Sequence, residues 1–176
     1  MERLDMSTIL SVCVLIILAV AGCAEMKADS YFNRALTYGK KGQYDQAIAD
    51  YTKAIEINPG HAMAYYNRGR AYAIGKGQYD QAIADYNKAI EINPGYAMAY
   101  YNRALTYSKK GQYDQAIADY NKAIKINPRF ILAYKNRGIV MMKLGNTKMA
   151  CSDWKQTCEL GDCHAYETAK RNGWCK

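Results

Sequence analysis

Apolar residues recur at spacings of three, four and seven along most of this chain, from Ala28 to His164. These spacings place apolar side chains on one face of a helix, so they predict a series of amphipathic α-helices. In the first part of the region the pattern predicts one helix over Tyr31 to Lys40 and a second over Tyr44 to Ile57. A glycine stops the first helix of each such pair, and an Asn-Pro step stops the second.

The helical pattern repeats with a period of about 34 residues. The decapeptide GQYDQAIADY begins at Gly42, Gly77 and Gly111, which defines units over 28–61, 62–96 and 97–130 and a degenerate fourth over 131–164. One unit alone cannot bury its rings, so neighbouring units must stack into a solenoid. The second unit has one extra residue, in Gly75-Lys76-Gly77, which we expect to lengthen a turn between helices.

The same residue types fill the same positions of each unit: aromatics at 4 and 24, and small residues at 8 and 20, with proline at 32 in the first three units. With this signature, residues 28–164 resemble tetratricopeptide repeats. The resemblance implies an all-α solenoid of helix-turn-helix repeats with a C-terminal cap helix over 165–176. Position 7 departs from the family, which usually has leucine there, so we expect arginine stems on the apolar surface with their heads in water. These arginines are Arg34, Arg68, Arg103 and Arg137.

An apolar run from Ser7 to Ala21 precedes the repeats and leads into Val20-Ala21-Gly22-Cys23. It resembles a bacterial lipoprotein signal peptide over 1–22, with Cys23 as the lipid-modified residue and 23–27 as a lipidated tether. The run is shorter than the ~20 residues of a membrane-spanning helix. Glu2 and Asp5 offset the positive charge of Arg3 near the start of this segment. A start at Met6 would remove both acids, so the true start is either Met1 or Met6.

The lipoprotein resemblance implies a lipid-anchored protein of the cell membrane. Ala24, rather than aspartate, follows the lipid-modified cysteine. By analogy with enteric bacteria, this favours the outer membrane, facing the periplasm of a Gram-negative bacterium. The alternative of the inner membrane stays open.

Four further cysteines lie close to the C-terminus: Cys151, Cys158, Cys163 and Cys175. An even cluster in an exported chain indicates two disulfides, for which three connectivities exist. A helical hairpin that turns at Gly161-Asp162 favours the nested pairs Cys158–Cys163 and Cys151–Cys175. A bond between Cys151 and Cys158 is disfavoured, because these two residues on one helix lie about 10 Å apart. The segment also resembles the cysteine-bearing ends of Sel1-like repeat proteins. Zinc is the alternative, but no CxxC spacing occurs, so we expect no metal.

The tetratricopeptide resemblance implies that the first helix of each unit lines a concave groove. Position 6 is asparagine in every unit, and a carboxamide both donates and accepts, which matches a peptide backbone. We expect aromatic residues at position 5, and Arg70 at position 9, to add contact area. Alternatively, these residues were copied with each unit and bind nothing. The predicted groove residues are Asn33, Asn67, Asn102, Asn136, Phe32, Tyr66, Tyr101 and Arg70.

The chain has a formal net charge of +8. Lysines at the turns within units predict a basic edge that could meet an anionic lipid, a cell-wall polymer or an acidic protein. Lysines at helix C-termini also have a local electrostatic role. A membrane anchor makes nucleic acid an improbable partner. The lysines are Lys40, Lys41, Lys76, Lys109 and Lys110.

No catalytic constellation is evident, because His61 and His164 have no matching nucleophile in the sequence. We therefore expect a non-enzymatic protein without a cofactor: a membrane-anchored scaffold that binds an extended segment of a partner in envelope assembly or secretion. The family's two-carboxylate clamp uses lysine at position 5 and asparagine at position 9, but position 5 is aromatic in the first three units and no unit has asparagine at position 9. We therefore do not expect binding of a C-terminal Glu-Glu-Val-Asp tail. The alternatives are a self-associating envelope protein and a Sel1-like β-lactam-binding protein.

Overall fold

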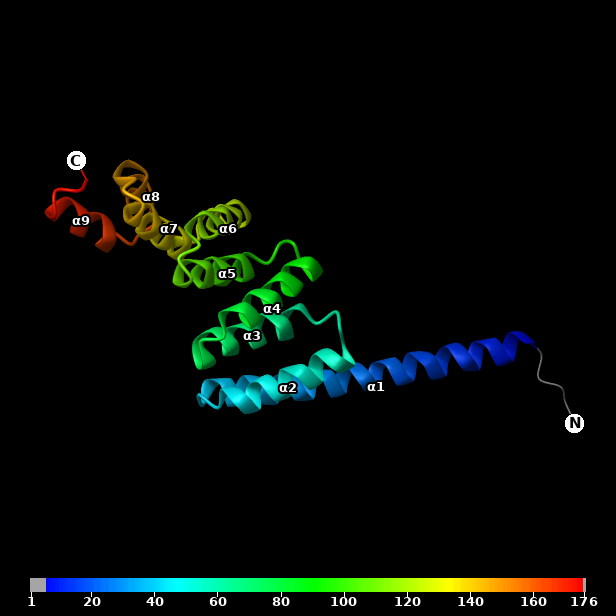
Figure 1. Ribbon diagram of the computed structural model, residues 1–176. Helices are drawn as coiled ribbons and strands as arrows, with labels where there is room; N and C mark the ends of the chain where they lie inside the picture. The colour runs from blue at the N-terminus through cyan, green and yellow to red at the C-terminus, as the bar shows by residue number, and fades with distance from the viewer. Residues whose placement is uncertain (1–5, 176) are drawn as a thin grey trace, which may run out of the picture.

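The computed structural model describes residues 6–175, with side chains from Gly22 onward. This part of the chain is all-α, and its helices form pairs that stack in chain order (Figure 1). The pairs are α1 (Met6–Lys40) with α2 (Tyr44–Ile57), α3 (Ala62–Arg70) and its continuation η1 (Ala71–Lys76) with α4 (Tyr79–Ile92), α5 (Ala97–Lys109) with α6 (Tyr113–Ile126), and α7 (Ile131–Lys143) with α8 (Thr147–Glu159), followed by α9 (His164–Arg171). The predicted all-α solenoid is confirmed.

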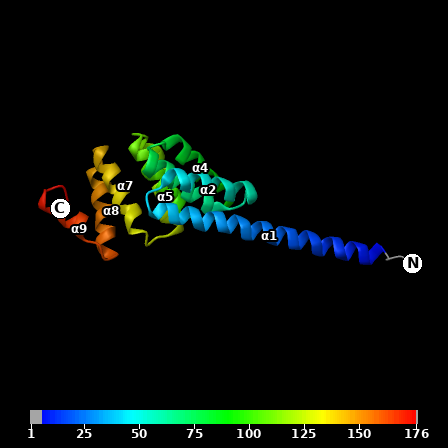
Figure 2. The same ribbon diagram turned by 90° about the horizontal axis from the view of Figure 1, so that it is seen from below.

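The N-terminal part of α1 projects beyond the stacked pairs (Figure 2). Residues 1–5 of the expected signal peptide lie outside the described residues, and only the backbone of residues 6–21 is described. Residues 23–27 are helical, so Cys23 precedes Ala28 by about 7.5 Å along α1. The Cys23 thiol is exposed and unpaired. Within the described residues, no helix has both the length and the apolar character to cross a membrane.

A stack of three rings forms the core of each of the first three units. The ring at position 5 lies 5.8 to 6.2 Å from the ring at position 24 and 4.6 to 4.9 Å from the ring at position 34. Fully buried alanines at positions 20 and 27 allow the helices to approach closely enough for this stacking. The position-5, -24 and -34 rings are Phe32, Tyr51 and His61, then Tyr66, Tyr86 and Tyr96, then Tyr101, Tyr120 and Phe130.

The arginines at position 7 differ from expectation, because each guanidinium is bound by an aspartate of its own unit instead of standing free in water. Each arginine donates two hydrogen bonds to an aspartate at position 23 of its own unit. These aspartates are only 5% exposed, and a buried carboxylate requires such a partner. The pairs are Arg34–Asp50, Arg68–Asp85, Arg103–Asp119 and Arg137–Asp153.

Three of these arginines also connect neighbouring units. The remaining guanidinium nitrogen of Arg68 donates to Thr52 Oγ1 at 3.0 Å, and that of Arg103 donates to Asn87 Oδ1 at 2.5 Å. Arg137 donates to Asn121 in the same way. Each acceptor sits at position 25 of the preceding unit, so one side chain ties together three helices.

The extra residue of the second unit also differs from expectation. It is absorbed in the π-helical turn η1, which widens the end of the first helix instead of lengthening the turn after it. Gly75 in this turn lies against the ring of Tyr44 from the first unit. A Cβ at residue 75 would overlap Tyr44 Cγ and its neighbouring ring atoms, so a larger residue would displace that ring.

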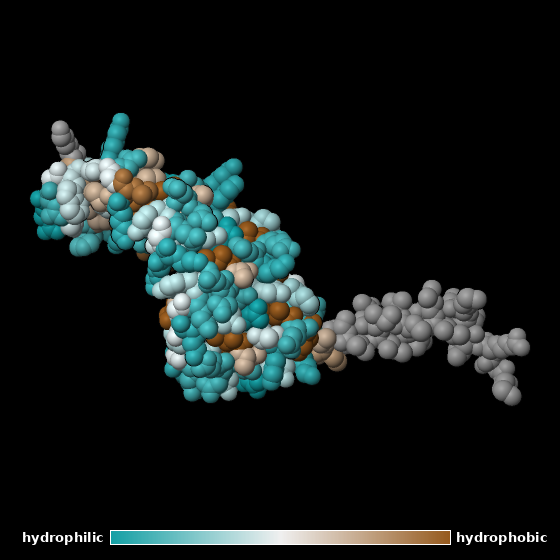
Figure 3. All heavy atoms as spheres, in the orientation of Figure 1, coloured by the Kyte–Doolittle hydropathy of each residue, from teal (hydrophilic) through white to brown (hydrophobic). Residues whose placement is uncertain are grey.

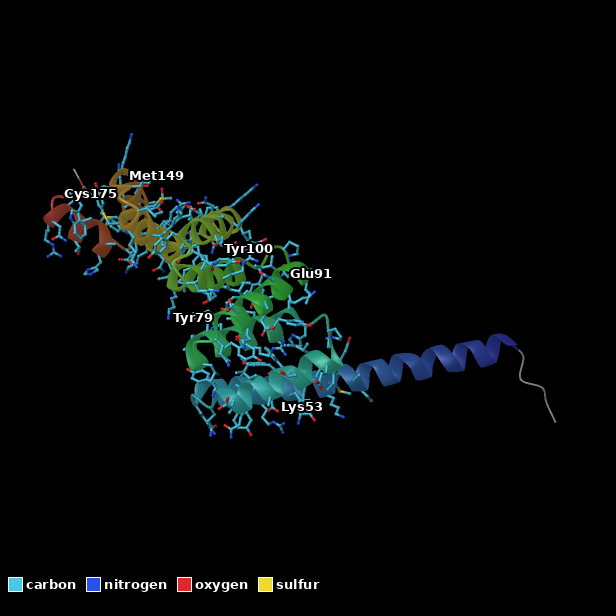
Figure 4. All side chains as sticks on the ribbon, viewed as in Figure 1. Lys53, Tyr79, Glu91, Tyr100, Met149 and Cys175 are labelled. Carbon is cyan, nitrogen blue, oxygen red and sulfur yellow. A yellow bond between two sulfur atoms is a disulfide. The ribbon has the colours of Figure 1, made fainter. Side chains whose placement is uncertain are left out.

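Two disulfides close the C-terminal end. Cys158 bonds to Cys163 and Cys151 bonds to Cys175, the nested pairing that the hairpin argument favours. The expected cap helix is shorter than predicted, because α9 ends at Arg171 and a turn with Gly173 at φ 72° follows. That turn returns Cys175 to α8, at the opposite end of the array from Lys53 of α2 (Figure 4).

Candidate functional site

Three of the four asparagines at position 6 use their NH₂ groups within the fold. Asn102 Nδ2 donates to the Met98 carbonyl at 2.9 Å and to the Tyr66 hydroxyl of the preceding unit at 3.0 Å, and Asn136 donates in the same way to Leu132 and to Tyr101 of its preceding unit. Asn67 Nδ2 donates to the Met63 carbonyl at 2.8 Å. We call the four position-6 asparagines the asparagine ladder. The expectation that the ladder both donates to and accepts from a ligand is corrected at Asn102 and Asn136, where both N–H groups are used within the fold. At Asn102 and Asn136 it is the Oδ1 acceptors that stay open to the N–H groups of a ligand.

The rings at position 5 are core residues. Phe32, Tyr66 and Tyr101 are 9%, 6% and 8% exposed, because each is stacked between two other rings. This corrects the expectation that they offer contact area in the groove. Tyr66 and Tyr101 act on the groove only indirectly. Their hydroxyls accept a hydrogen bond from the position-6 asparagine of the following unit and so fix its side chain. Asn33, by contrast, lies exposed on α1.

A hollow of about 200 Å³ opens where the first unit meets α3 and η1. Leu36 and Ile74 give it apolar walls, and Tyr51 also lines it. Two cationic side chains, Lys40 and Arg70, line the same hollow beside Asn67. We call it the first hollow. It brings together two of the predicted groove residues, Asn67 and Arg70, and one residue of the predicted basic edge.

The differences between the otherwise similar units gather at the first hollow. Position 9 is arginine in the second unit, Arg70, but leucine or isoleucine in the others, Leu36, Leu105 and Ile139. Ile74 stands where the first unit has Lys40. Sequence reasoning included Arg70 but missed Leu36, Tyr51 and Ile74. Comparing the units position by position would have marked the change at Ile74.

Electrostatically, the first hollow is cationic. No carboxylate in the described part of the chain lies within ion-pair distance of Arg70 or Lys40. The Arg70 guanidinium lies 5.8 Å from the Tyr66 ring centroid, a cation–π distance. Burial raises the pKa of Tyr51 to about 12, so its phenol is neutral at physiological pH. The hollow can therefore take an apolar side chain with a carboxylate beside it.

The predicted basic edge is partly neutralised by neighbouring units. Lys76 Nζ lies 2.6 Å from the Asp45 carboxylate, and Lys110 pairs with Asp80. Lys109 lies 5.9 Å from the centroid of the Tyr79 ring. These lysines therefore have structural partners on the preceding unit. Elsewhere, the face of the array seen in Figure 3 is mainly hydrophilic, with hydrophobic residues in separate small patches.

Models of tetratricopeptide repeats match residues 28–61, 50–84 and 97–130, and a model of the TPR repeat matches 74–111. Together they cover the first three helix pairs without a gap. The chain is a tetratricopeptide repeat protein. Among curated proteins, Hsc70-interacting protein 1 of Drosophila melanogaster is 42% identical over 53 residues, which are 30% of this chain and only 13% of that protein.

Solved structures resemble the repeat array over a greater length. A crystal structure of MamA protein is 30% identical, with a TM-score of 0.71 over 83% of this chain and 76% of that one. The first TPR of Spaghetti (RPAP3), bound to HSP90 peptide SRMEEVD, is 26% identical, with a TM-score of 0.67 over 69% of this chain and 95% of that one. The second structure holds a peptide on a repeat array of the same fold.

Proposed function

We propose that this tetratricopeptide repeat protein is a membrane-anchored, non-enzymatic scaffold that binds an extended segment of a partner protein, in cell-envelope assembly or secretion. The first hollow carries the proposal. Arg70 and Lys40 there have no acidic partner in the described chain, and apolar walls adjoin them. An extended segment with an acidic residue next to an apolar one complements both features.

The asparagine ladder supports the same proposal. The carboxamides of Asn102 and Asn136 are fixed by two hydrogen bonds each, so their acceptors are held in place before a ligand arrives. A preorganised acceptor loses little side-chain entropy on binding. The Spaghetti repeat structure, solved with a bound peptide, shows that a related array of this kind can hold such a segment.

The proposed anchor is a lipid on Cys23. This thiol is exposed and free, whereas Cys151, Cys158, Cys163 and Cys175 are paired. Several acyl chains on one cysteine would give stable attachment, whereas a single chain is marginal. Replacing Cys23 with alanine in the native host should remove the lipid mass and leave residues 1–22 attached, because the lipid is added to Cys23 before the signal peptide is cleaved. A mature wild-type protein whose mass carries no lipid would contradict the anchor.

Photo-cross-linking in the native host tests the groove. A benzophenone amino acid at Ile74, which lines the first hollow, should give discrete adducts with a partner. The matched control is the same label at Lys88, exposed on α4. Arg70→Leu should weaken the adducts, and the chain already carries leucine at this position in Leu36 and Leu105. Equal labelling from Lys88, or no adducts from Ile74, would refute binding in the groove.

A further inference from the structure

The fourth unit lacks a ring that the first three units all contain. At position 5, where those units have Phe32, Tyr66 and Tyr101, the fourth unit has Lys135. The Lys135 ammonium lies 3.5 Å from the Asp162 carboxylate. Trp154 at position 24 and His164 at position 34 remain, and the Trp174 ring after α9 lies 6.5 Å from the Trp154 ring, but no ring occupies position 5.

A second hollow, of about 160 Å³, lies between these two outer members. It opens to solvent, since the side chains of Ile139 and Trp174 at its edge are 42% and 49% exposed. Ile139 is at position 9, the same place in its unit as Arg70 in the first hollow, so both hollows adjoin the first helices of their units. The second hollow is lined by Lys135, Ile139, Trp154, His164, Thr168 and Trp174.

A change in the cap adds to the missing volume. Position 4 is tyrosine in all four units, but the corresponding residue of α9 is Thr168. A threonine leaves open the space that a tyrosine would occupy beside the stack. Two aromatic positions are therefore replaced around this one hollow, while large rings remain on its walls.

We propose that the second hollow is a binding site for an aromatic side chain, a phenylalanine or tyrosine ring, carried by the extended partner segment. This inference rests on the proposed function. The chain itself supplies the template, because Tyr66 and Tyr101 fill the corresponding space with ring centroids 4.9 Å from the ring at position 34. A guest ring in the second hollow would lie beside Trp154 and beside the Trp174 ring, whose centroid is 6.5 Å from that of Trp154.

Ring geometry gives the site its selectivity. Aromatic pairs at these separations gain electrostatic attraction between ring edges and faces in addition to apolar burial. An aliphatic side chain would gain only the burial. The second hollow should therefore prefer phenylalanine to leucine, and both to alanine.

Tryptophan fluorescence provides a local test, because the two tryptophans of the chain, Trp154 and Trp174, both line the second hollow. The oxidised full chain would be titrated with N-acetyl-phenylalaninamide, and with the leucine and alanine amides as matched ligands. The phenylalanine amide should give a saturable change in fluorescence, and the alanine amide should bind at least about tenfold more weakly. No saturable change with the phenylalanine amide, or equal binding of the three amides, would overturn the proposal.

Two substitutions at one residue separate the empty space from the lysine. Lys135→Phe, which copies Phe32 of the first unit, should fill the second hollow and abolish binding. Lys135→Ala should leave the hollow open and retain binding. Circular dichroism would establish that both variants are folded. Undiminished binding to Lys135→Phe, or equal loss in both variants, would overturn the proposal.

This titration is independent of the cross-linking at Ile74. Arg70→Leu should leave the fluorescence titration unchanged, since the two hollows lie in different units. Loss of the specific cross-links from Ile74 would refute partner binding in the groove. Intact cross-links without a saturable fluorescence change would refute only the aromatic site in the second hollow.

Discussion

The two ends of the solenoid are closed in different ways. At the N-terminal end the described residues hold no helix pair before the first one, and the Arg34 side chain is 54% exposed although it pairs with Asp50. At the C-terminal end two disulfides hold α9 and Cys175 against α8, where the fourth unit has lost part of its ring stack. Between the ends, each position-7 arginine is 17% exposed and bonds to the preceding unit. A repeated ion pair thus has different surroundings at different places in the array.

The electrostatics follow this difference. The Arg34 guanidinium holds the pKa of Asp50 below its usual value. At Asp85, burial raises the pKa of the carboxyl, and Arg68 offsets only part of that effect. An interior pair therefore depends more on each partner, because neither charge can turn to water if the other is removed.

The largest expected effect comes from breaking an interior pair. Asp119→Ala should lower the free energy of unfolding by about 3–5 kcal/mol, because it leaves the largely buried Arg103 charge without its carboxylate. The same change at Asp50 should cost clearly less, since Arg34 is half exposed. Urea denaturation followed by circular dichroism measures both. Equal losses at the two places would contradict the comparison.

Removing both partners tests the cause. Arg103→Leu combined with Asp119→Ala should recover part of the loss, because no unpaired charge stays buried. The coupling energy from this double-mutant cycle should exceed that of the matching cycle at Arg34 and Asp50. A double variant less stable than Asp119→Ala alone would show that packing, rather than the uncompensated charge, dominates.

Opening the C-terminal end should have the next largest effect. Replacing Cys151 and Cys175 by alanine should cost about 3 kcal/mol, because this bond joins residues 24 apart in sequence. Replacing Cys158 and Cys163, only 5 apart, should cost about 2 kcal/mol. Unfolding with and without a reductant measures each bond, and reductant should have no further effect once all four cysteines are replaced. A larger loss from the shorter bridge would contradict this ordering.

A smaller effect is expected from a methyl group at position 8. In Gly138→Ala the new Cβ would lie 2.6 Å from Trp154 Nε1, so the indole must shift, at about 1–3 kcal/mol. Gly69→Ala meets Tyr86 Cε1 at 2.9 Å, but Ala35 and Ala104 already occupy this position beside a tyrosine. It should cost less than Gly138→Ala. Thermal unfolding gives the cost, and tryptophan fluorescence should change only for Gly138→Ala. A greater cost at Gly69 would show that Trp154 is the more adaptable neighbour.

The fold was predictable because its signals repeat. The regular period, the glycines that end first helices and the Asn-Pro steps all recur, so each unit supports the interpretation of the others. The ion pairs were not predicted, although Arg34 and Asp50 are both visible in the sequence. An arginine on an apolar surface predicts a head in water, and the aspartate that binds it lies 16 or 17 residues away, on the second helix of the same unit.

The site was predictable only in part. Arg70 and the asparagine ladder came from family positions, but those positions do not say that Tyr66 and Tyr101 would be buried by the rings at position 34. Each hollow is lined by residues of successive helices. Some of these residues, such as Ile74 and Lys135, differ from the residue that other units have at the same position. Differences between units, rather than their shared residues, carry that information.

The smallest expected effect concerns the lysine edge. Asp80 pairs with Lys110 of the next unit, but the aspartate side chain is 84% exposed. Asp80→Asn should therefore cost less than about 1 kcal/mol, and the loss should shrink as salt is added. Asp114→Asn is the matched control, because Asp114 has the same place in the first turn of its helix but forms no ion pair among the described residues. Both changes remove a charge that favours the helix N-terminus. Their difference therefore isolates the ion pair, and a large, salt-independent difference would mean that this edge, like the interior arginines, holds the units together.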